Sequence, residues 1–332
     1  MDSSDASSAG KTSNLRMVSL FCGCGGFDLG VKGGFDYLGH HYGENGVDIV
    51  YANDIDTAAA KMYQANFGQV PDLRDINEID SSEIPDTDII TGGFPCQSFS
   101  VAAENEHRLG VKDDRGKLFF EMCRIIRDKQ PLCFIAENVP GLLTANDGEA
   151  FPLIISEFRN CGYEVVSSIM DASQFGIPQK RQRVIMVGIR KDVPAEFSFG
   201  TIRRSNHPEP LSSVLEQDVP ERYHYSRDSV DRQLRKKKSE RKYHIQDPSK
   251  PCRTIGSHLW KTSLNSSDPV LETEGGLRRF TQREVARIQG FPDSFTLTGG
   301  GKYQYHALGN AVPPVMIWHV ANPLCDLLRE QL

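Results

Sequence analysis

A cysteine stands where a predicted strand ends, in the sequence Gly92-Gly93-Phe94-Pro95-Cys96-Gln97. The preceding residues 88–91 form a short apolar run that predicts a buried strand, and the two glycines end it. Pro95 fixes its own φ and pushes Phe94 toward an extended conformation, so the chain delivers Cys96 at the carboxyl end of this strand. Catalytic groups of open α/β sheets lie at that end, which makes Cys96 a candidate thiolate nucleophile. A buried core cysteine is the ordinary alternative unless other site residues converge on the same edge.

Charged side chains adjoin two further predicted strands. Glu137 follows the apolar run 132–136, and a carboxylate there costs free energy unless it is used or paired. Arg181 and Arg183 precede the apolar run 184–189 and share one face of an extended segment, because side chains alternate along it. Two guanidinium groups in this arrangement can hold a phosphate, a carboxylate or a base edge. Since the carboxyl ends of parallel strands meet at one edge, we expect Glu137 and the cysteine to lie close together.

A glycine-rich turn at 22–26 separates an apolar strand from a predicted helix, which is typical of a nucleotide-binding corner. The pattern is not the full dinucleotide fingerprint, so a purely structural turn is the alternative. Asp54 ends the next strand, 49–53, where it can bind a ribose diol or cap the helix predicted over 57–67. Asp75 and Ile76 are candidates for contacts to an adenine ring.

Composition indicates an ordinary globular protein. The chain has 332 residues, of which 39% are hydrophobic and 25% charged, enough for one large and one smaller domain. It contains no apolar run long enough to span a membrane. The eight cysteines form no Cys-x-x-Cys pair and lie near no histidine set, so they predict neither a zinc site nor a disulfide framework. A reducing cytoplasm fits this usage.

Charge is distributed unevenly along the chain. The net charge is −6, but residues 171–290 carry 23 Lys and Arg against 15 Asp and Glu, a local net charge of +8. A basic region joined to an acidic remainder suggests one surface that faces a polyanion. A solvated helix face is the alternative for the basic run 232–242.

The remaining pattern predicts an α/β chain with a loop-rich insertion. The polar stretch 97–117 is expected to form a mobile loop that closes over substrate. Helices are predicted over 118–128 and 151–161, with a strand over 164–171. Periodicity is lost over 191–276, which predicts a small second domain. Residues 281–284 form a capping box that opens a helix, and a last helix runs over 315–329.

Taken together, these residues resemble the DNA (cytosine-5)-methyltransferase family over about residues 16–330. The motifs that carry the resemblance are Phe21–Gly26, Gly93–Gln97, Glu137–Val139, Gln179–Arg183, Arg283–Glu284 with Gln289–Pro292, and Gly309–Asn310. Each motif is weak alone, whereas all of them in the family's order are specific. The sequence departs from the family pattern at Ala102-Ala103, where many relatives carry glycine. The hinge of loop 97–117 is therefore expected to differ from theirs.

The resemblance implies a fold and a domain organisation. We expect a disordered tail (1–15), a Rossmann-like S-adenosylmethionine-dependent methyltransferase domain (16–190), a small target-recognition domain (191–276) and a C-terminal segment (277–332) that packs back on the catalytic domain. The cofactor would be S-adenosyl-L-methionine, with S-adenosyl-L-homocysteine as the product, and no metal is expected.

The resemblance also assigns residues. Cofactor contacts are expected from Phe21, Gly23, Cys24, Gly26, Asp54, Ile55, Asp75, Ile76, Gly93, Pro95, Leu118, Asn310 and Ala311. Among these, Asp54 would take the ribose, Ile55 would stack on the adenine, and Asn310 would meet the methionine end. The catalytic residues would be Cys96, Gln97, Glu137, Arg181 and Arg183.

The implied reaction is methylation of C5 of a cytosine flipped out of a specific duplex DNA sequence, through a covalent bond between Cys96 and C6. Glu137 would donate to N3, Arg183 would bind O2 and Gln97 would lie near the vacated space. A bacterial cytoplasmic monomer, nucleoid-associated on DNA and paired with a restriction endonuclease, is expected. The alternatives are a transfer-RNA cytosine-5 methyltransferase, whose Pro-Pro-Cys-Gln differs from Phe94-Pro95-Cys96-Gln97 here, a catalytically silent DNA-binding relative, and a nicotinamide dehydrogenase.

Overall fold

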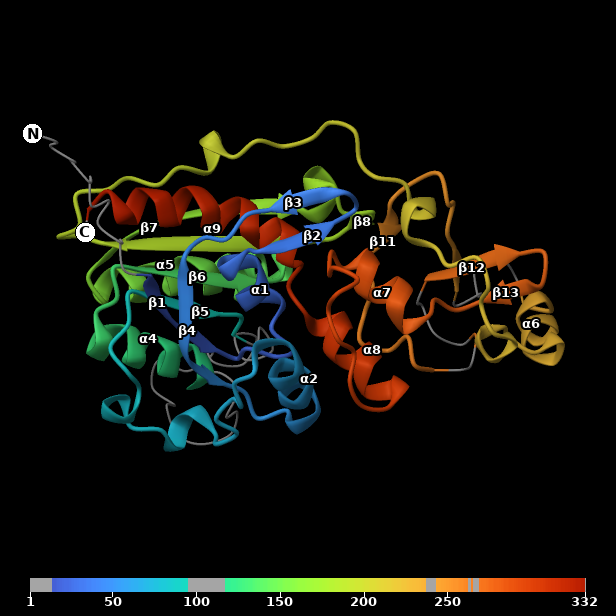
Figure 1. Cartoon of the computed structure of the whole chain (residues 1–332), viewed down its shortest axis with the longest axis horizontal. Coiled ribbons are helices and arrows are strands. Elements are labelled where there is room, and N and C mark those ends of the chain that lie inside the picture. Colours follow the sequence, from blue (N-terminus) through green and yellow to red (C-terminus); the bar gives the residue numbers. More distant parts are fainter. Residues whose placement is uncertain (1–13, 95–116, 237–242, 262–263, 265–268, 332) are drawn as a thin grey trace, which may run out of the picture.

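A six-stranded sheet forms the centre of the larger unit (Figure 1). The computed structural model describes residues 14–94, 117–236, 243–261, 264 and 269–331. The strand order is β4-β1-β5-β6-β9-β7. Its strands are β1 (Leu15–Leu20), β4 (Val47–Asn53), β5 (Ile89–Gly92), β6 (Cys133–Asn138), β7 (Tyr163–Asp171) and β9 (Gln182–Arg190). The first four in this order are parallel, and β9 runs antiparallel to both β6 and β7.

The central strands are apolar because helices cover both faces of the sheet. Every residue of β5 and β6 is buried. Alternate residues of β1 enter different cores: Met17 packs on one face and Val18 on the other. Strand β6 ends at Asn138, two residues beyond the predicted run 132–136. Glu137 is therefore the second-last residue of the strand rather than a residue after it.

Helices α1 (Gly26–Lys32) and α9 (Pro314–Arg329) cover one face, while α4 (Lys117–Lys129) and α5 (Ala150–Asn160) cover the other. The last helix therefore completes a core that the first strand begins. Close approach of α1 and α9 depends on Gly30, where an added Cβ would lie 2.5 Å from the carbonyl oxygen of Pro314. Helix α2 (Thr57–Phe67) has the predicted bounds. The predicted Rossmann-like α/β fold is confirmed.

A hairpin that the sequence pattern did not predict follows α1 and contacts Arg287 and Trp318. It consists of β2 (Phe35–Tyr37) and β3 (His40–Tyr42). The Tyr37 hydroxyl donates to the carbonyl of Arg287 at 2.6 Å, and the Trp318 indole donates to the carbonyl of Gly43 at 2.8 Å. The hairpin therefore holds the C-terminal segment against the region that follows α1.

The smaller unit lies at the other end of the molecule and contains short elements (Figure 1). These are α6 (Arg227–Leu234), β10 (His244–Ile245), β12 (Pro269–Thr273) and β13 (Gly276–Arg278), with α7 (Gln282–Ile288) and α8 (Gly301–Asn310) between the two units. Strand β8 (Gln179–Lys180) pairs with β11 (Cys252–Arg253) at the junction. Short 3-10 helices lie at Ile76–Glu78, Ser81–Glu83, Pro140–Leu143, Ala145–Gly148, Ala172–Phe175, Phe199–Thr201, Leu211–Val214 and Glu221–Tyr223.

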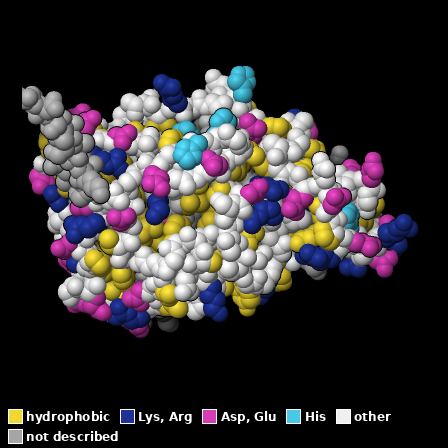
Figure 2. Space-filling model, viewed as in Figure 1, with side chains coloured by type: hydrophobic (Ala, Val, Ile, Leu, Met, Phe, Trp, Pro, Cys, Tyr) yellow, Lys and Arg dark blue, Asp and Glu magenta, His cyan; other side chains and the backbone are white. Residues whose placement is uncertain are grey.

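The first part of the region expected to recognise DNA packs on the large unit. Residues 191–206 run back along the sheet before the chain crosses to the smaller unit, and Phe197 and Ile202 join the core beneath α9. On the face drawn in Figure 2, Lys and Arg side chains are interspersed with Asp and Glu over both units. The basic excess of 171–290 is therefore not concentrated on that face. In the described parts of the chain, no helix is long and apolar enough to cross a bilayer.

A buried ion pair fixes the predicted capping box of α7. Arg278 donates to both carboxylate oxygens of Glu284 at 2.7 and 2.8 Å, and the side chains are 4% and 0% exposed. Glu284 also accepts from the backbone amides of Thr281 and Glu216. The carboxylate thus joins β13, α7 and the loop at residue 216.

Replacing Arg278 by alanine should lower the free energy of unfolding by about 3–5 kcal/mol, because the buried Glu284 carboxylate loses its counter-charge. Urea denaturation measures this loss. Lys250→Ala, which removes an exposed pair with Asp247, is the control and should leave the unfolding midpoint nearly unchanged. Equal effects of the two substitutions would contradict this account.

Candidate active site

A cavity of about 820 Å³ opens at the carboxyl ends of β1, β4, β5 and β6, where the C-terminal segment meets the sheet. The predicted site residues that line it are Phe21, Gly23, Cys24, Gly26, Asp54, Ile55, Asp75, Ile76, Gly93, Leu118, Glu137, Arg181, Arg183, Asn310 and Ala311. Pro95, Cys96 and Gln97 lie outside the described residues. Residues far apart in the chain thus meet around one space.

The glycine-rich turn after β1 forms one wall of the cavity. Phe21 and Gly23 have φ angles of 56° and 55°, and the value at Phe21 is strained for a residue with a side chain. An added Cβ at Gly26 would lie 2.4 Å from the carbonyl oxygen of Val312, so glycine allows the C-terminal segment to approach. The turn is held by Asp54, whose Oδ2 accepts from the Gly23 amide at 2.7 Å.

Asp54 is fixed by backbone amides and does not cap α2. Its Oδ1 accepts from the Asp56 amide at 2.7 Å. Burial raises the pKa of the Asp54 carboxyl, while the two amides oppose that shift. The cap of α2 is Asp56, which accepts from the amides of Ala58 and Ala59. The capping alternative weighed for Asp54 therefore belongs to the residue two positions later.

Apolar surface lies beside this carboxylate. The Ile55 side chain is exposed (66% for the residue), although large apolar side chains usually avoid water. Ile76 lines the cavity nearby and is 2% exposed. Asp75 caps the short helix that follows it through the Asn77 amide. This corner offers a flat apolar contact and hydrogen-bond acceptors, a combination that suits a nucleoside.

The opposite wall carries an ion pair. Arg183 Nε lies 2.7 Å from Glu137 Oε1, and both side chains are largely buried. Burial raises the pKa of the Glu137 carboxyl, and the charges of Arg183 and Arg181 oppose the shift. An added Cβ at Gly93 would lie 3.2 Å from Glu137 Oε2, so the strand end passes close to this carboxylate. The pairing of β5 with β6 confirms that these two strand ends share an edge.

Asn138 positions the chain that leads to the predicted nucleophile. Its Nδ2 donates to the carbonyl of Phe94 at 3.0 Å, and its Oδ1 accepts from the Val139 amide at 2.9 Å. Phe94 is the last described residue before Pro95, so Asn138 fixes the backbone where the strand ends. Its position next to Glu137 was the signal that could have identified this role.

Arg181 and Arg183 both line the cavity, but their guanidinium groups have different partners. Arg181 is 2% exposed and donates to the carbonyls of Ile255 at 2.9 Å and of Gly309 and Ala311 at 3.0 Å each. Burial lowers its pKa to about 9. Arg181 thus joins the sheet, the junction and the C-terminal segment, while Arg183 faces Glu137.

Helix α8 contributes a lining residue that the sequence motifs did not identify, besides the predicted Asn310. His306 lies one helical turn before Asn310 and also lines the cavity. Its Nδ1 is 3.6 Å from Asp56 Oδ2, across the gap between α8 and α2. The four-residue spacing from Asn310 was the available signal, since side chains with that spacing share a helix face.

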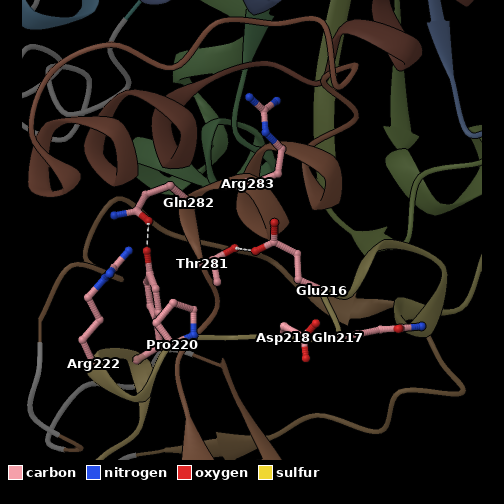
Figure 3. A pocket seen from close by; sticks show the side chains of 9 residues that line it. Glu216, Gln217, Asp218, Pro220, Arg222, Thr281, Gln282 and Arg283 are labelled. Atoms are coloured by element: carbon pink, nitrogen blue, oxygen red, sulfur yellow. Dashed lines mark hydrogen bonds between the residues drawn. The ribbon is translucent and has the colours of Figure 1, made fainter.

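A second cavity, of about 530 Å³, lies in the smaller unit and contains none of the predicted site residues (Figure 3). Its walls combine Glu216 and Asp218 with Arg222, and the Tyr223 hydroxyl donates to Gln282 at 2.5 Å. Arg283 points away from the other side chains drawn and donates to the carbonyl of Phe295 at 3.0 Å. The Thr281 hydroxyl donates to Glu216 at 2.5 Å. In the described residues, no cluster of His, Cys, Asp and Glu could hold a metal ion.

Comparison with known proteins identifies the class. The family model for the C-5 cytosine-specific DNA methylase matches residues 15–325, so the chain belongs to this family. The chain is a DNA (cytosine-5) methyltransferase, as the motifs predicted.

Particular relatives agree with this assignment. The chain is 34% identical to "Type II methyltransferase M1.ScrFI" of Lactococcus lactis subsp. cremoris, over 96% of this chain and 80% of that protein. It is 33% identical to "Type II methyltransferase M.NgoBI" of Neisseria gonorrhoeae, over 94% and 93% of the two chains. Among solved structures, S. pombe Dnmt2 methyltransferase superposes with a TM-score of 0.73 at 21% identity, covering 96% of this chain and 99% of that one. This last likeness shows the fold alone.

Arg181→Lys should slow methyl transfer by about 100-fold, because the single nitrogen of an ammonium group cannot reach carbonyls that two guanidinium nitrogens hold, and the C-terminal wall shifts. The free energy of unfolding should fall by about 2–4 kcal/mol, since buried carbonyls lose their donors. Steady-state kinetics and urea denaturation measure the two effects. Arg16→Lys, at a half-exposed pair with Asp88, is the control. Wild-type kinetics for Arg181→Lys would refute the role of the guanidinium fork.

Beneath the glycine-rich turn lies a buried carboxyl group. Asp28, in the first turn of α1, is 0% exposed and accepts from the Tyr63 hydroxyl at 2.9 Å. Burial raises its pKa from 3.8 to about 6. The folded protein therefore binds this proton more tightly than the unfolded chain does. Stability from this group is fully present below about pH 4 and is lost as the pH rises through about 6.

Asp28→Asn removes this titration while an amide oxygen can still accept from Tyr63. Relative to the parent protein, the variant should gain about 3 kcal/mol in the free energy of unfolding between about pH 4 and pH 8. Urea denaturation at the two pH values measures the gain. A difference between the proteins that does not change with pH would show that Asp28 is not the titrating group.

Proposed function

We propose that the protein transfers a methyl group from S-adenosyl-L-methionine to C5 of cytosine within a specific duplex DNA sequence, through a covalent bond between Cys96 and C6. One observation carries the proposal: a single cavity is lined by the Asp54 and Ile55 corner on one side and by the Glu137–Arg183 pair on the other. Phe94, which lines the same cavity, lies two positions before Cys96 in the sequence.

The corner fits the adenosine of S-adenosyl-L-methionine. Asp54 keeps carboxylate lone pairs for a ribose diol, and the exposed Ile55 side chain offers an apolar surface for an adenine ring. Asn310 and Ala311 would meet the methionine end from the facing wall. When bound, the cofactor supplies a methyl group on a positively charged sulfur.

Cytosine C5 is a weak nucleophile, so the chain's own residues must activate the ring. The Cys96 thiolate adds to C6 and makes C5 electron-rich. Glu137, in its protonated form, donates to N3, and its buried setting, which raises its pKa, favours that form. Arg183 orients Glu137 and donates to O2 of the base. After methylation, a base such as water takes the proton from C5, the C–H electrons form the C5–C6 double bond, and the Cys96 thiolate leaves C6, which restores the ring.

The target base must leave the duplex to reach this cavity. Loop 97–117, proposed to close over the DNA with Gln97 near the vacated space, lies outside the described residues apart from Lys117. Residues 191–276 would recognise the target sequence. The relatives' names support a restriction endonuclease as the companion of this protein. We propose that the enzyme works as a monomer on the nucleoid, in a bacterial cytoplasm.

Duplex DNA that contains 5-fluorocytosine should trap a covalent complex, because fluorine cannot leave as the C5 proton does. Cys96→Ser should give no complex and lower the rate of methyl transfer by about 10³ or more, while binding of S-adenosyl-L-homocysteine stays within about tenfold. Mass spectrometry and calorimetry measure the two. Cys325→Ala, a change in α9 away from the cavity, is the control. A methyl group on an exocyclic nitrogen, or preferred methylation of transfer RNA, would refute the proposal.

A further inference from the structure

His306 extends from the last turns of α8 into the cavity mouth. The side chain is 49% exposed and lines the same cavity as Asp54 and Glu137. Its Nε2 lies 3.4 Å from Nδ2 of Asn310, and its Nδ1 lies 3.6 Å from Oδ2 of Asp56. The ring therefore has one nitrogen directed toward the cap of α2 and the other toward the residue proposed to meet the methionine end.

The cavity has an excess of negative side chains. Its described lining includes four carboxylates, those of Asp54, Asp56, Asp75 and Glu137. The groups in the same lining that can carry positive charge are those of Arg181, Arg183 and His306. Three backbone carbonyls occupy Arg181, and Glu137 pairs with Arg183. His306 is thus the described lining residue best able to offer positive charge to a ligand.

The proposed cofactor carries its own carboxylate, at its amino-acid end. Beside the carboxylates of Asp54, Asp56 and Asp75 this group needs a positively charged or hydrogen-bonding partner. We infer that His306 binds the carboxylate of the amino-acid end of S-adenosyl ligands, together with the amide of Asn310; this inference rests on the proposed function. In the structure Nε2 of His306 accepts from Nδ2 of Asn310. A bound carboxylate would take that place, accepting from the Asn310 amide and from a protonated Nε2, while Nδ1 faces Asp56.

A purely structural role for His306 predicts something different. Its contact with Asp56 joins α8 to α2, so the residue could stabilise the cavity without touching a ligand. Such a role would affect every ligand of the cavity alike. A direct contact with the carboxylate affects only ligands that have one. Two ligands separate these cases: S-adenosyl-L-homocysteine, and 5′-methylthioadenosine, which has the same nucleoside but no amino acid.

Calorimetry of the full-length protein with both ligands provides the test. His306→Leu should weaken binding of S-adenosyl-L-homocysteine about tenfold, the loss expected for one charge-assisted hydrogen bond in a half-exposed setting, and change binding of 5′-methylthioadenosine less than about twofold. His306→Lys should restore the affinity for S-adenosyl-L-homocysteine to within about threefold. Circular dichroism checks that each variant is folded.

Asp56→Asn is the second variant, because asparagine still caps α2 but removes the carboxylate that faces Nδ1 of His306. It should weaken binding of S-adenosyl-L-homocysteine more than binding of 5′-methylthioadenosine, because the positively charged ring loses its partner. An equal loss for both ligands in His306→Leu, or no loss for either, would overturn the inference and leave the proposed function standing. A folded parent protein that binds neither S-adenosyl-L-homocysteine nor S-adenosyl-L-methionine would instead refute the proposed cofactor, and the inference with it.

Discussion

The buried guanidinium of Arg181 is the interaction on which the site depends. It donates to carbonyls of Ile255, Gly309 and Ala311, which lie 74, 128 and 130 residues after it in the chain. Burying a positive charge is costly unless its donors are satisfied. Only arginine has donors fixed in a planar fork that can meet carbonyls from several directions. The Arg181 guanidinium therefore both holds the cavity wall in place and contributes to the stability of the fold.

Burial controls the protonation of the acidic groups around the cavity. Asp28, Asp54 and Glu137 lie on three different elements, and burial raises the pKa of each. The opposing groups differ: Asp54 is held by backbone amides, whereas Glu137 faces Arg183. Carboxyl groups near one cavity thus have different partners, backbone amides in one case and a guanidinium group in the other.

Local sequence signals predicted much of the fold. The apolar runs located β1, β4, β5 and β6 in the sequence. The predicted helix over 57–67 and the capping box at Thr281 also agree with the structure. These features depend on neighbouring residues. The antiparallel insertion of β9 between β6 and β7, and the hairpin of β2 and β3, depend on contacts between distant segments, so one sequence could not reveal them.

The residues of the candidate site also fall into two groups: those that local sequence identified and those that only the structure revealed. Family motifs identified Glu137, Arg183 and Asp54, whose neighbours in the chain are distinctive. They did not separate the two arginines, because the partners of Arg181 come from Ile255 and the C-terminal segment. His306 was missed because its surroundings are set by the distance between α8 and α2. Contacts made across elements are what the structure adds.

Helix α9 has a consequence for how the protein is made. Its buried residues Val315, Met316, Ile317, Val320, Ala321, Leu324, Cys325 and Leu328 cover a face of the sheet that β1 begins. During translation that face is covered only in part, by α1 and residues 197–202, until the last described helix leaves the ribosome. A polypeptide released before α9 is made would expose this apolar face. Cellular quality control would degrade such a polypeptide before it could methylate DNA.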